Sequence, residues 1–340
     1  MTIAASVDAL VPYGWDERVA TLYASLASDG HEPGRVGRVD RDRCTVRTAT
    51  GTLRAAAEVL PVTGDWVALR HDDGSPAVDV VLSRWSALER EGQLLAANVD
   101  IVFVVAALDR ELNLNRMERE LVLAWDSGAR PVVVLTKSVS VADVDVLTKT
   151  VAARAVGVDV VTTSAASGQG VEDLLAHIRP NRTAVLLGPS GAGKSTMVNR
   201  ILDREALVTA PVREGDHKGR HTTSSRHLVV VPGGGVLIDT PGLRSVGLTG
   251  AEGGVALTFP DIEELGEGCR FRDCRHVGEP GCAVVEAMGD GRLDPERVAS
   301  YRKVQGEMEE SAKEPWAKAA DSQQARIVHR AMKKMPKKKR

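Results

Sequence analysis

A glycine-rich loop near the middle of the chain carries the residue types that bind a nucleoside triphosphate. It matches the pattern G-x-x-x-x-G-K-[ST] and consists of Gly188, Pro189, Ser190, Gly191, Ala192, Gly193, Lys194, Ser195 and Thr196. An apolar run at 184–187 precedes the loop and a helical pattern follows it, which is the context this motif requires. In such loops backbone N–H groups surround the β-phosphate, Lys194 binds the β and γ oxygens, and the Ser195 hydroxyl binds Mg²⁺. We therefore predict a site for a nucleoside triphosphate with magnesium.

A carboxylate and two hydroxyls downstream of the loop can complete the magnesium site. Asp239 ends an apolar run and begins the pattern D-x-x-G, which closes at Gly242. We expect the Asp239 carboxylate to hold the metal through its water shell and the Gly242 amide to contact the γ-phosphate. Thr222 and Thr223 lie in the polar segment 218–224 and are predicted to reach the metal when triphosphate is bound. That segment would then be a switch.

Hydrolysis also needs a group that orients the attacking water. In many GTPases a Gln next to D-x-x-G takes this role, but this chain has Leu243 there. His221 stands beside the switch threonines, and histidines titrate near neutral pH. We predict that His221 positions the water and that Lys194 acts with it in catalysis. The alternative is that His221 only hydrogen-bonds its own loop or contacts RNA.

Three cysteines and a histidine lie close together near the C-terminus. They are Cys269, Cys274, His276 and Cys282. Four such ligands make a closed tetrahedral site for a structural Zn²⁺, and this short, polar segment could hardly fold around a core without metal. A disulfide would leave one of these cysteines over and does not suit a reducing compartment. The remaining cysteine, Cys44, is predicted to be a buried small hydrophobe.

The first element that must position these residues is a small β-barrel. Short alternating runs separated by turn residues extend from about residue 35 to residue 88, and this spacing is typical of a barrel. Such a barrel can bind nucleic acid or serve as a docking platform. Trp66 and Trp85 either stack on bases or fill the barrel core or its base, and we favour the second.

The second element is a parallel sheet. After residue 98, long apolar runs at 100–105 and 131–135 alternate with helical patterns such as 117–127. This alternation predicts βαβ units. Beyond residue 258 the strand pattern stops, and a polar helical stretch at 294–308 leads to the end of the chain.

Length and charge bound the possible classes of protein. At 340 residues the chain predicts several domains, and no apolar run approaches the roughly 20 residues of a membrane-spanning helix. The N-terminus has no secretory pattern, so we expect a cytoplasmic protein without a membrane partner. Eight Lys or Arg and no acidic residue fall in 326–340 although the net charge is -2. This basic tail suits an acidic polymer; the alternative is a solvated disordered end.

Together these motifs resemble a known family, the circularly permuted, ribosome-small-subunit-dependent GTPase A. Ordinary GTPases have the phosphate loop first, whereas here the candidate base-reading residues Thr136, Lys137, Ser164 and Ala165 precede it. The resemblance rests on Gly64-Asp65-Trp66-Val67, Leu114-Asn115-Arg116, Gly219-Arg220-His221-Thr222-Thr223, Asp239-Thr240-Pro241-Gly242 and the cysteine cluster. Matched site residues in the family's order imply function more strongly than a shared fold.

The resemblance implies a multidomain α/β protein. Its parts would be an N-terminal extension (1–30), a five-stranded OB-type β-barrel (31–92), a circularly permuted P-loop GTPase domain (93–250), a mostly helical zinc-binding domain (251–325) and the basic tail (326–340). It further implies a monomeric GTP hydrolase that acts late in assembly of the small ribosomal subunit and binds its rRNA. Intrinsic turnover would be slow and stimulated by the subunit, and hydrolysis to GDP would release the protein.

One residue departs from the family pattern. The base-reading motif is N-K-x-D or T-K-x-D, and its Asp accepts hydrogen bonds from guanine, but here Val139 stands in that place. Each such charge-assisted bond contributes about 1.5 to 3 kcal/mol. Asp143 is a candidate replacement, and the backbone amide at Ser164 and Ala165 can still bind guanine O6. We hypothesise that GTP remains the preferred ligand with weaker affinity or discrimination.

The departure keeps two rival functions open. One is a P-loop ATPase or kinase that has lost guanine specificity, and the other is an RNA-binding protein with a structural nucleotide. In the favoured reading, Arg270, Arg272 and Arg275 and the basic tail face rRNA. Because the chain runs from the D-x-x-G switch directly into the zinc segment, nucleotide state would reposition this C-terminal surface.

Overall fold

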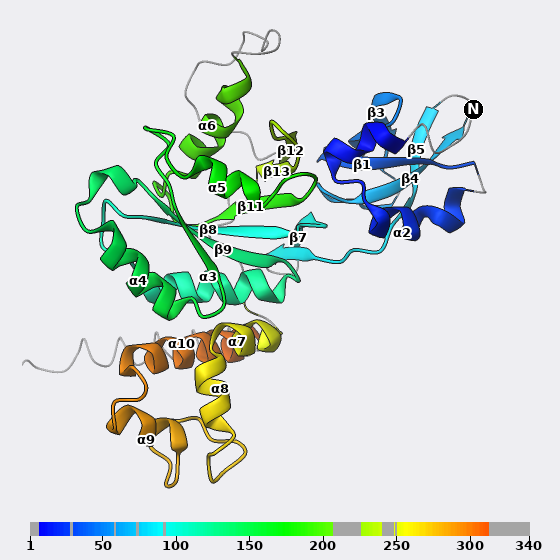
Figure 1. Ribbon diagram of the computed structural model, residues 1–340. Helices are drawn as coiled ribbons and strands as arrows, with labels where there is room; N and C mark the ends of the chain where they lie inside the picture. The colour runs from blue at the N-terminus through cyan, green and yellow to red at the C-terminus, as the bar shows by residue number, and fades with distance from the viewer. Residues whose placement is uncertain are drawn as a thin grey trace, which may run out of the picture.

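The computed structural model describes residues 7–27, 30–57, 59–72, 75–90, 93–206, 226–239, 248 and 250–312. A barrel, a sheet covered by helices, and a group of C-terminal helices follow one another along the chain (Figure 1). Within the described residues, no helix combines the length and apolar character needed to cross a membrane.

The N-terminal part is a closed five-stranded barrel. Its strands are β1 (Glu32–Val39), β2 (Arg43–Thr48), β3 (Gly51–Ala56), β4 (Trp66–Asp72) and β5 (Ser75–Val81). They pair in the order β1-β2-β3-β5-β4, and β4 returns to β1. The β3–β5 pair is parallel and the others are antiparallel. The predicted OB-type barrel is confirmed. Cys44 is buried inside it, as predicted, and burial raises the pKa of its thiol to about 11.

The residues before the barrel pack against it. A 3₁₀ helix, η1 (Asp8–Tyr13), and α2 (Glu17–Ala27) bring Trp15 edge-on to Trp66, with ring centroids 5.3 Å apart. Trp66 is 1% exposed and belongs to the buried cluster between the barrel and these N-terminal helices, so it is not a stacking platform. Trp85 is half-buried, and the Arg18 guanidinium lies 3.6 Å from its ring centroid.

The central part is a six-stranded sheet. Its strands are β8 (Ile101–Ala107), β9 (Arg130–Thr136), β10 (Asp159–Thr162), β11 (Thr183–Leu187), β12 (His227–Val230) and β13 (Val236–Asp239), and a hairpin of β6 (Ala87–Arg90) and β7 (Gln93–Ala97) leads into it. The order is β10-β9-β8-β11-β13-β12, and every pair except β12–β13 is parallel. β8 is apolar throughout because both of its faces are buried.

Helices cover both faces of this sheet. α3 (Leu114–Asp126) and α4 (Val144–Arg154) pack on one face, and α5 (Val171–Ala176) and α6 (Lys194–Ala206) pack on the other. A short 3₁₀ helix, η2 (Ser138–Ser140), follows β9. The predicted βαβ domain is therefore confirmed, with the phosphate-loop strand β11 at the centre of the sheet but fourth among its strands in chain order.

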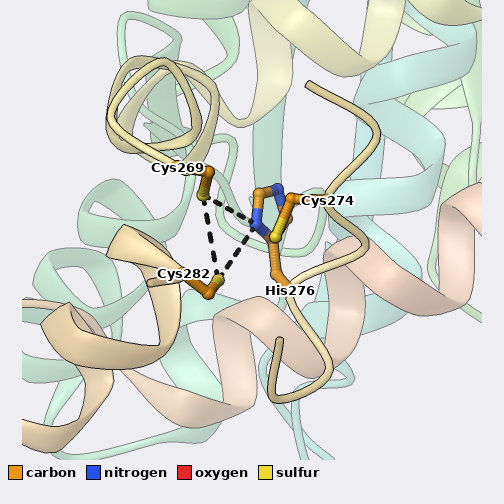
Figure 2. A group of neighbouring side chains, drawn as sticks. All are labelled: Cys269, Cys274, His276 and Cys282. Carbon is orange, nitrogen blue, oxygen red and sulfur yellow. Dashed lines mark hydrogen bonds between the residues drawn. The ribbon is translucent and has the colours of Figure 1, made fainter. Parts of the chain in front are cut away.

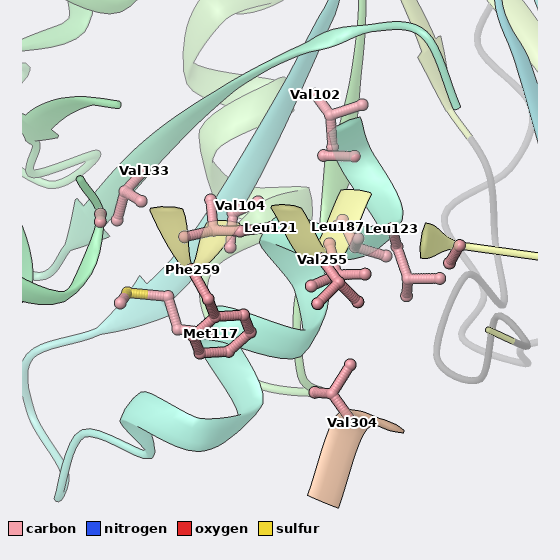
Figure 3. Packing of buried hydrophobic residues seen from close by; sticks show 14 of the residues in the cluster. Val102, Val104, Met117, Leu121, Leu123, Val133, Leu187, Val255, Phe259 and Val304 are labelled. Carbon is pink, nitrogen blue, oxygen red and sulfur yellow. The ribbon is translucent and has the colours of Figure 1, made fainter. Parts of the chain in front are cut away.

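The C-terminal helices share a core with the central sheet. They are α7 (Glu252–Thr258), α8 (Pro260–Gly266), α9 (Ala283–Gly289) and α10 (Pro295–Ala312). Val255, Phe259 and Val304 belong to the same buried cluster as Leu121 of α3 (Figure 3). A Cβ on Gly254 would lie 2.3 Å from the backbone oxygen of Val122, so glycine is required for α7 to approach α3 this closely.

Buried charges connect the same helices. Glu118 of α3 is fully buried and accepts hydrogen bonds from Arg297 of α10 (2.8 Å) and Arg154 of α4 (3.1 Å). Arg297 also makes two bonds to the Asp261 carboxylate of α8, at 2.6 and 2.7 Å. Buried charges are tolerated only when they are paired, so this network requires the three helices α3, α4 and α10 to be together.

A second buried charge joins the barrel to the sheet. The Arg35 guanidinium donates to the backbone oxygens of Tyr13 (2.7 Å), Gly64 (3.1 Å) and Asn98 (3.1 Å) and to the Thr183 hydroxyl (2.9 Å) at the start of β11. Burial lowers its pKa to about 10, which leaves it charged at neutral pH.

The contact between the barrel and the sheet explains the motif Gly64-Asp65-Trp66-Val67. Gly64 has φ +96°, and a Cβ there would lie 2.2 Å from the backbone oxygen of Ala97. The buried Asp65 carboxylate accepts two bonds of 2.7 Å from Arg84.

Replacing Arg297 by alanine tests the charge network. Arg297→Ala leaves Glu118 buried with one partner fewer, so the free energy of unfolding should fall by about 3 to 5 kcal/mol. Urea unfolding followed by tryptophan fluorescence measures the change. Arg292→Ala is the matched control, because Arg292 pairs with Asp290 on the surface and should cost less than about 1 kcal/mol. Equal effects of the two substitutions would contradict the role of the network.

Candidate functional site

The phosphate loop connects β11 to α6 at the carboxyl edge of the sheet. Gly188, Gly191 and Gly193 all have positive φ, and a Cβ on Gly188 would lie 2.4 Å from the backbone oxygen of Val105 in β8. Lys194 Nζ donates to the backbone oxygens of Gly188 and Pro189, both at 2.7 Å. These glycines let backbone N–H groups converge, and α6 begins directly after the loop, which is the geometry that binds phosphate.

The candidate base-reading residues lie beside this loop. The Thr136 hydroxyl, at the end of β9, donates to the backbone oxygen of Ala192 at 2.6 Å. The Ser138 amide donates to the backbone oxygen of Thr163, the residue before Ser164, at 3.1 Å. The structure therefore brings Thr136, Lys137 and the segment at Ser164 and Ala165 to the edge that carries the phosphate loop. Thr136 has a positioning role that the motif did not indicate.

Asp239 ends β13, which lies directly beside β11 in the sheet. Both Ser195 and Asp239 are exposed and stand at the carboxyl edge, as a shared magnesium site requires. Across the antiparallel pair, Asp239 faces His227, whose pKa is lowered by burial. Four of the predicted site residues lie outside the described residues: His221, Thr222, Thr223 and Gly242.

Val139 is exposed on η2, two residues after Lys137. Asp143 is also exposed and stands at the N-cap of α4, where its side chain makes no capping bond. Their roles in base reading remain predictions.

Two charged residues at this edge escaped the sequence analysis. Asp109 and Arg110 follow β8, and the Asp109 carboxylate accepts a 2.6 Å bond from Lys137 Nζ. Arg110 Nη2 donates to the backbone oxygen of Gly191 in the phosphate loop at 3.2 Å. The bond from Lys137 holds the pKa of Asp109 below its usual range. Polar residues directly after a buried parallel strand were the available signal, since such strand ends carry binding sites.

The cysteine cluster has the dimensions of a zinc site. Cys269 Sγ lies 3.8 Å from Cys282 Sγ, and His276 Nδ1 lies 3.5 and 3.4 Å from these sulfurs (Figure 2). The ligand atoms of all four residues, Cys274 included, are within 4.8 Å of one another. Zn–S bonds of about 2.3 Å and Zn–N bonds of about 2.0 to 2.1 Å give tetrahedral edges of about 3.8 Å and about 3.5 Å. These four residues can hold one zinc ion, as predicted.

Glu279 is a further residue of this site that the sequence analysis missed. Its carboxylate accepts backbone N–H bonds from Arg275 (2.8 Å), Val277 (2.8 Å) and Gly278 (3.1 Å). Backbone donors, its own amide first, lower the pKa of Glu279 to about 2. The bonds surround His276, which has the unfavourable φ of +59°. Glu279 therefore fixes the loop that presents the histidine ligand.

Glu279→Ala should loosen this loop and weaken zinc affinity about tenfold, because partners that orient metal ligands typically contribute 10- to 100-fold. Competition with a colorimetric zinc chelator at neutral pH measures the affinity. Glu264→Ala, on the exposed side of α8, is the control and should bind zinc like the wild type. The same zinc affinity in both variants would show that Glu279 does not support the site.

The strand order, the phosphate loop and the base-side segments define a P-loop nucleotide-binding domain in permuted order, set between an OB-type barrel and a Cys₃His domain. The family model described as RsgA GTPase matches residues 81–249. The chain belongs to the RsgA GTPase family.

Relatives and solved structures agree with this assignment. A small ribosomal subunit biogenesis GTPase RsgA of Streptomyces coelicolor is 49% identical over 317 residues, covering 88% of this chain and 86% of the relative. One from Opitutus terrae is 41% identical over 336 residues, with 88% and 90% covered. The crystal structure of YjeQ from Thermotoga maritima has a TM-score of 0.62 at 26% identity, and 82% of this chain and 98% of that chain are covered. The structure of YloQ, a circularly permuted GTPase, is similar in fold, with a TM-score of 0.63 at 24% identity and coverage of 84% and 97%.

Proposed function

We propose that this chain hydrolyses GTP and acts in the biogenesis of the small ribosomal subunit. The observation that carries the proposal is the phosphate loop, held by Thr136 from the base-side segment, in a chain 49% identical to a small ribosomal subunit biogenesis GTPase. Family and site agree, which is stronger support than fold alone. The protein would hold GTP while it is bound to the small subunit, and hydrolysis would release GDP and phosphate.

The residues at the sheet edge have distinct proposed roles. Backbone amides of the loop and Lys194 bind the phosphates, and Ser195 and Asp239 would hold Mg²⁺, with Thr222 and Thr223 added from the switch. The metal neutralises charge that develops on the phosphates. His221 orients the water, and the Gly242 amide senses the γ-phosphate. These roles are supported by residue type and by the shared edge on which Ser195 and Asp239 stand.

The surface of the zinc domain suits an RNA partner. Arg270, Arg272 and Arg275 are exposed, together with Phe271 at 44% and Val277 at 67%. Arginines neutralise phosphates, and an exposed aromatic ring can stack on an unpaired base. These exposed residues of the zinc domain and the basic tail would contact rRNA of the small subunit.

The remaining proposals concern the whole chain. We propose the division into residues 1–30, 31–92, 93–250, 251–325 and 326–340, a monomeric state, and a cytosolic location. None of the four cysteines, all in the described part of the chain, forms a disulfide, which suits a reducing compartment.

Phosphate release decides between this function and its rivals. Purified protein should release phosphate slowly from GTP, and faster when purified small ribosomal subunits are added, because the partner orders the switch. ATP in place of GTP is the parallel measurement. Release from ATP at least as fast as from GTP would favour the ATPase or kinase. No release from either nucleotide, even with subunits, would favour an RNA-binding protein with a structural nucleotide.

Val139→Asp tests the base-reading position. A carboxylate at residue 139 should tighten GTP binding about tenfold and leave ATP binding unchanged, since one charge-assisted bond contributes about 1.5 to 3 kcal/mol. Titrations with fluorescent GTP and ATP analogues measure both affinities. Val146→Asp, which adds the same charge at another exposed valine of this region, is the control. A gain of similar size for both nucleotides would place residue 139 outside the guanine site.

A further inference from the structure

Four charged or polar groups from three separate segments meet at the nucleotide edge. The Asp109 carboxylate lies 2.6 Å from Lys137 Nζ and 3.4 Å from Arg110 Nε. Arg110 reaches the phosphate loop at Gly191. The turn after β8, which no motif assigns to the nucleotide, therefore touches both the base side and the phosphate side of the site.

Lys137 occupies the central place in this cluster. It is in the left-handed region, with φ +62°. Its neighbour Thr136 is bonded to the phosphate loop, and its other neighbour, Ser138, is bonded to Thr163. The Lys137 side chain, about a third exposed, therefore starts between the phosphate loop and the segment that begins at Ser164. A flexible lysine chain contributes to a binding surface only when its ammonium is held, because ordering a free chain costs entropy.

Asp109 supplies that hold. Another acceptor at this edge is the Gly191 backbone oxygen, but it is bonded to the Arg110 guanidinium and not to Lys137. Two cations beside each other repel unless an anion lies between them, and Asp109 lies between Lys137 and Arg110. The three side chains are a third to a half exposed, so a nucleotide can approach them.

We propose that Asp109 is a positioning residue for the purine nucleotide: it holds the Lys137 side chain where its methylene groups support the base, while Arg110 fixes the same turn on the phosphate loop. The inference rests on the proposed nucleotide-binding function. It places part of the affinity for the base outside the T-K-x-D motif, in a chain that has valine at the last position of that motif.

A double-mutant cycle tests the proposal. We expect Asp109→Ala to weaken binding of a fluorescent GDP analogue about tenfold, equal to roughly 1.4 kcal/mol. If Asp109 acts through Lys137, the same substitution in a Lys137→Ala background should change the affinity less than about twofold. Asp159→Ala is the matched control, because Asp159 also pairs with an exposed cation, Arg130, at 2.7 Å on the same sheet, but at its opposite edge. The control should bind GDP like the wild type.

Each other outcome overturns the proposal in a recognisable way. No effect of Asp109→Ala, or an equal effect in both backgrounds, excludes action through Lys137. A gain of xanthosine diphosphate binding in Asp109→Asn would show that the carboxylate reads the base directly instead of positioning Lys137. If the wild type binds neither GDP nor ADP, the proposed function fails and this inference fails with it. If the wild type binds and Asp109→Ala matches it, only this inference fails.

Discussion

The pairing of Glu118 with Arg297 and Arg154 is the interaction on which the relation between the sheet and the zinc domain depends. A carboxylate with no exposed surface in the middle of α3 would be strongly destabilising without a cationic partner. Its charge is paired through Oε1, to which α10 of the C-terminal part supplies one guanidinium and α4 supplies the other. The zinc domain is therefore part of the environment that α3 requires.

The barrel is joined to the sheet by the same kind of interaction. Arg35 satisfies three backbone oxygens of the barrel region and its junction, and its fourth acceptor is Thr183 of β11. That strand leads into the phosphate loop, and α3 follows the turn of Asp109 and Arg110 that contacts the loop. The barrel is thus held to β11 by the buried Arg35, and the zinc domain is held to α3 by the buried Arg297.

Local patterns were sufficient to predict the parallel strands at 100–105 and 131–135 and to propose the two sites that are continuous in sequence. The phosphate loop lies between a strand and a helix, and the zinc ligands fall within residues 269–282, so short spacing encodes both. Asp109 and Arg35 were missed because their partners, Lys137 and Thr183, are 28 and 148 residues away. Such pairings depend on topology, which periodicity does not specify.

Ambiguous residues were resolved by neighbours that the motif did not include. Trp66 could be a stacking platform or a core residue by type alone, and Trp15 from the preceding segment decides for the core. Glu279 looked like an ordinary acidic loop residue, but three backbone amides turn toward it around His276. In both cases the deciding interaction involves backbone geometry or a residue outside the recognised pattern.

The packing of α7 also limits how nucleotide state can reach the zinc domain. The chain enters this domain soon after Asp239, which suggests a direct pull from the switch. However, Gly254 brings α7 against the backbone of Val122, and Arg297 bonds Glu118 of the same helix α3. Closely packed helices resist small independent shifts, so the C-terminal helices would have to move together with α3. Because α3 follows the Asp109 turn, the edge that carries the phosphate loop is also linked to the zinc domain through α3.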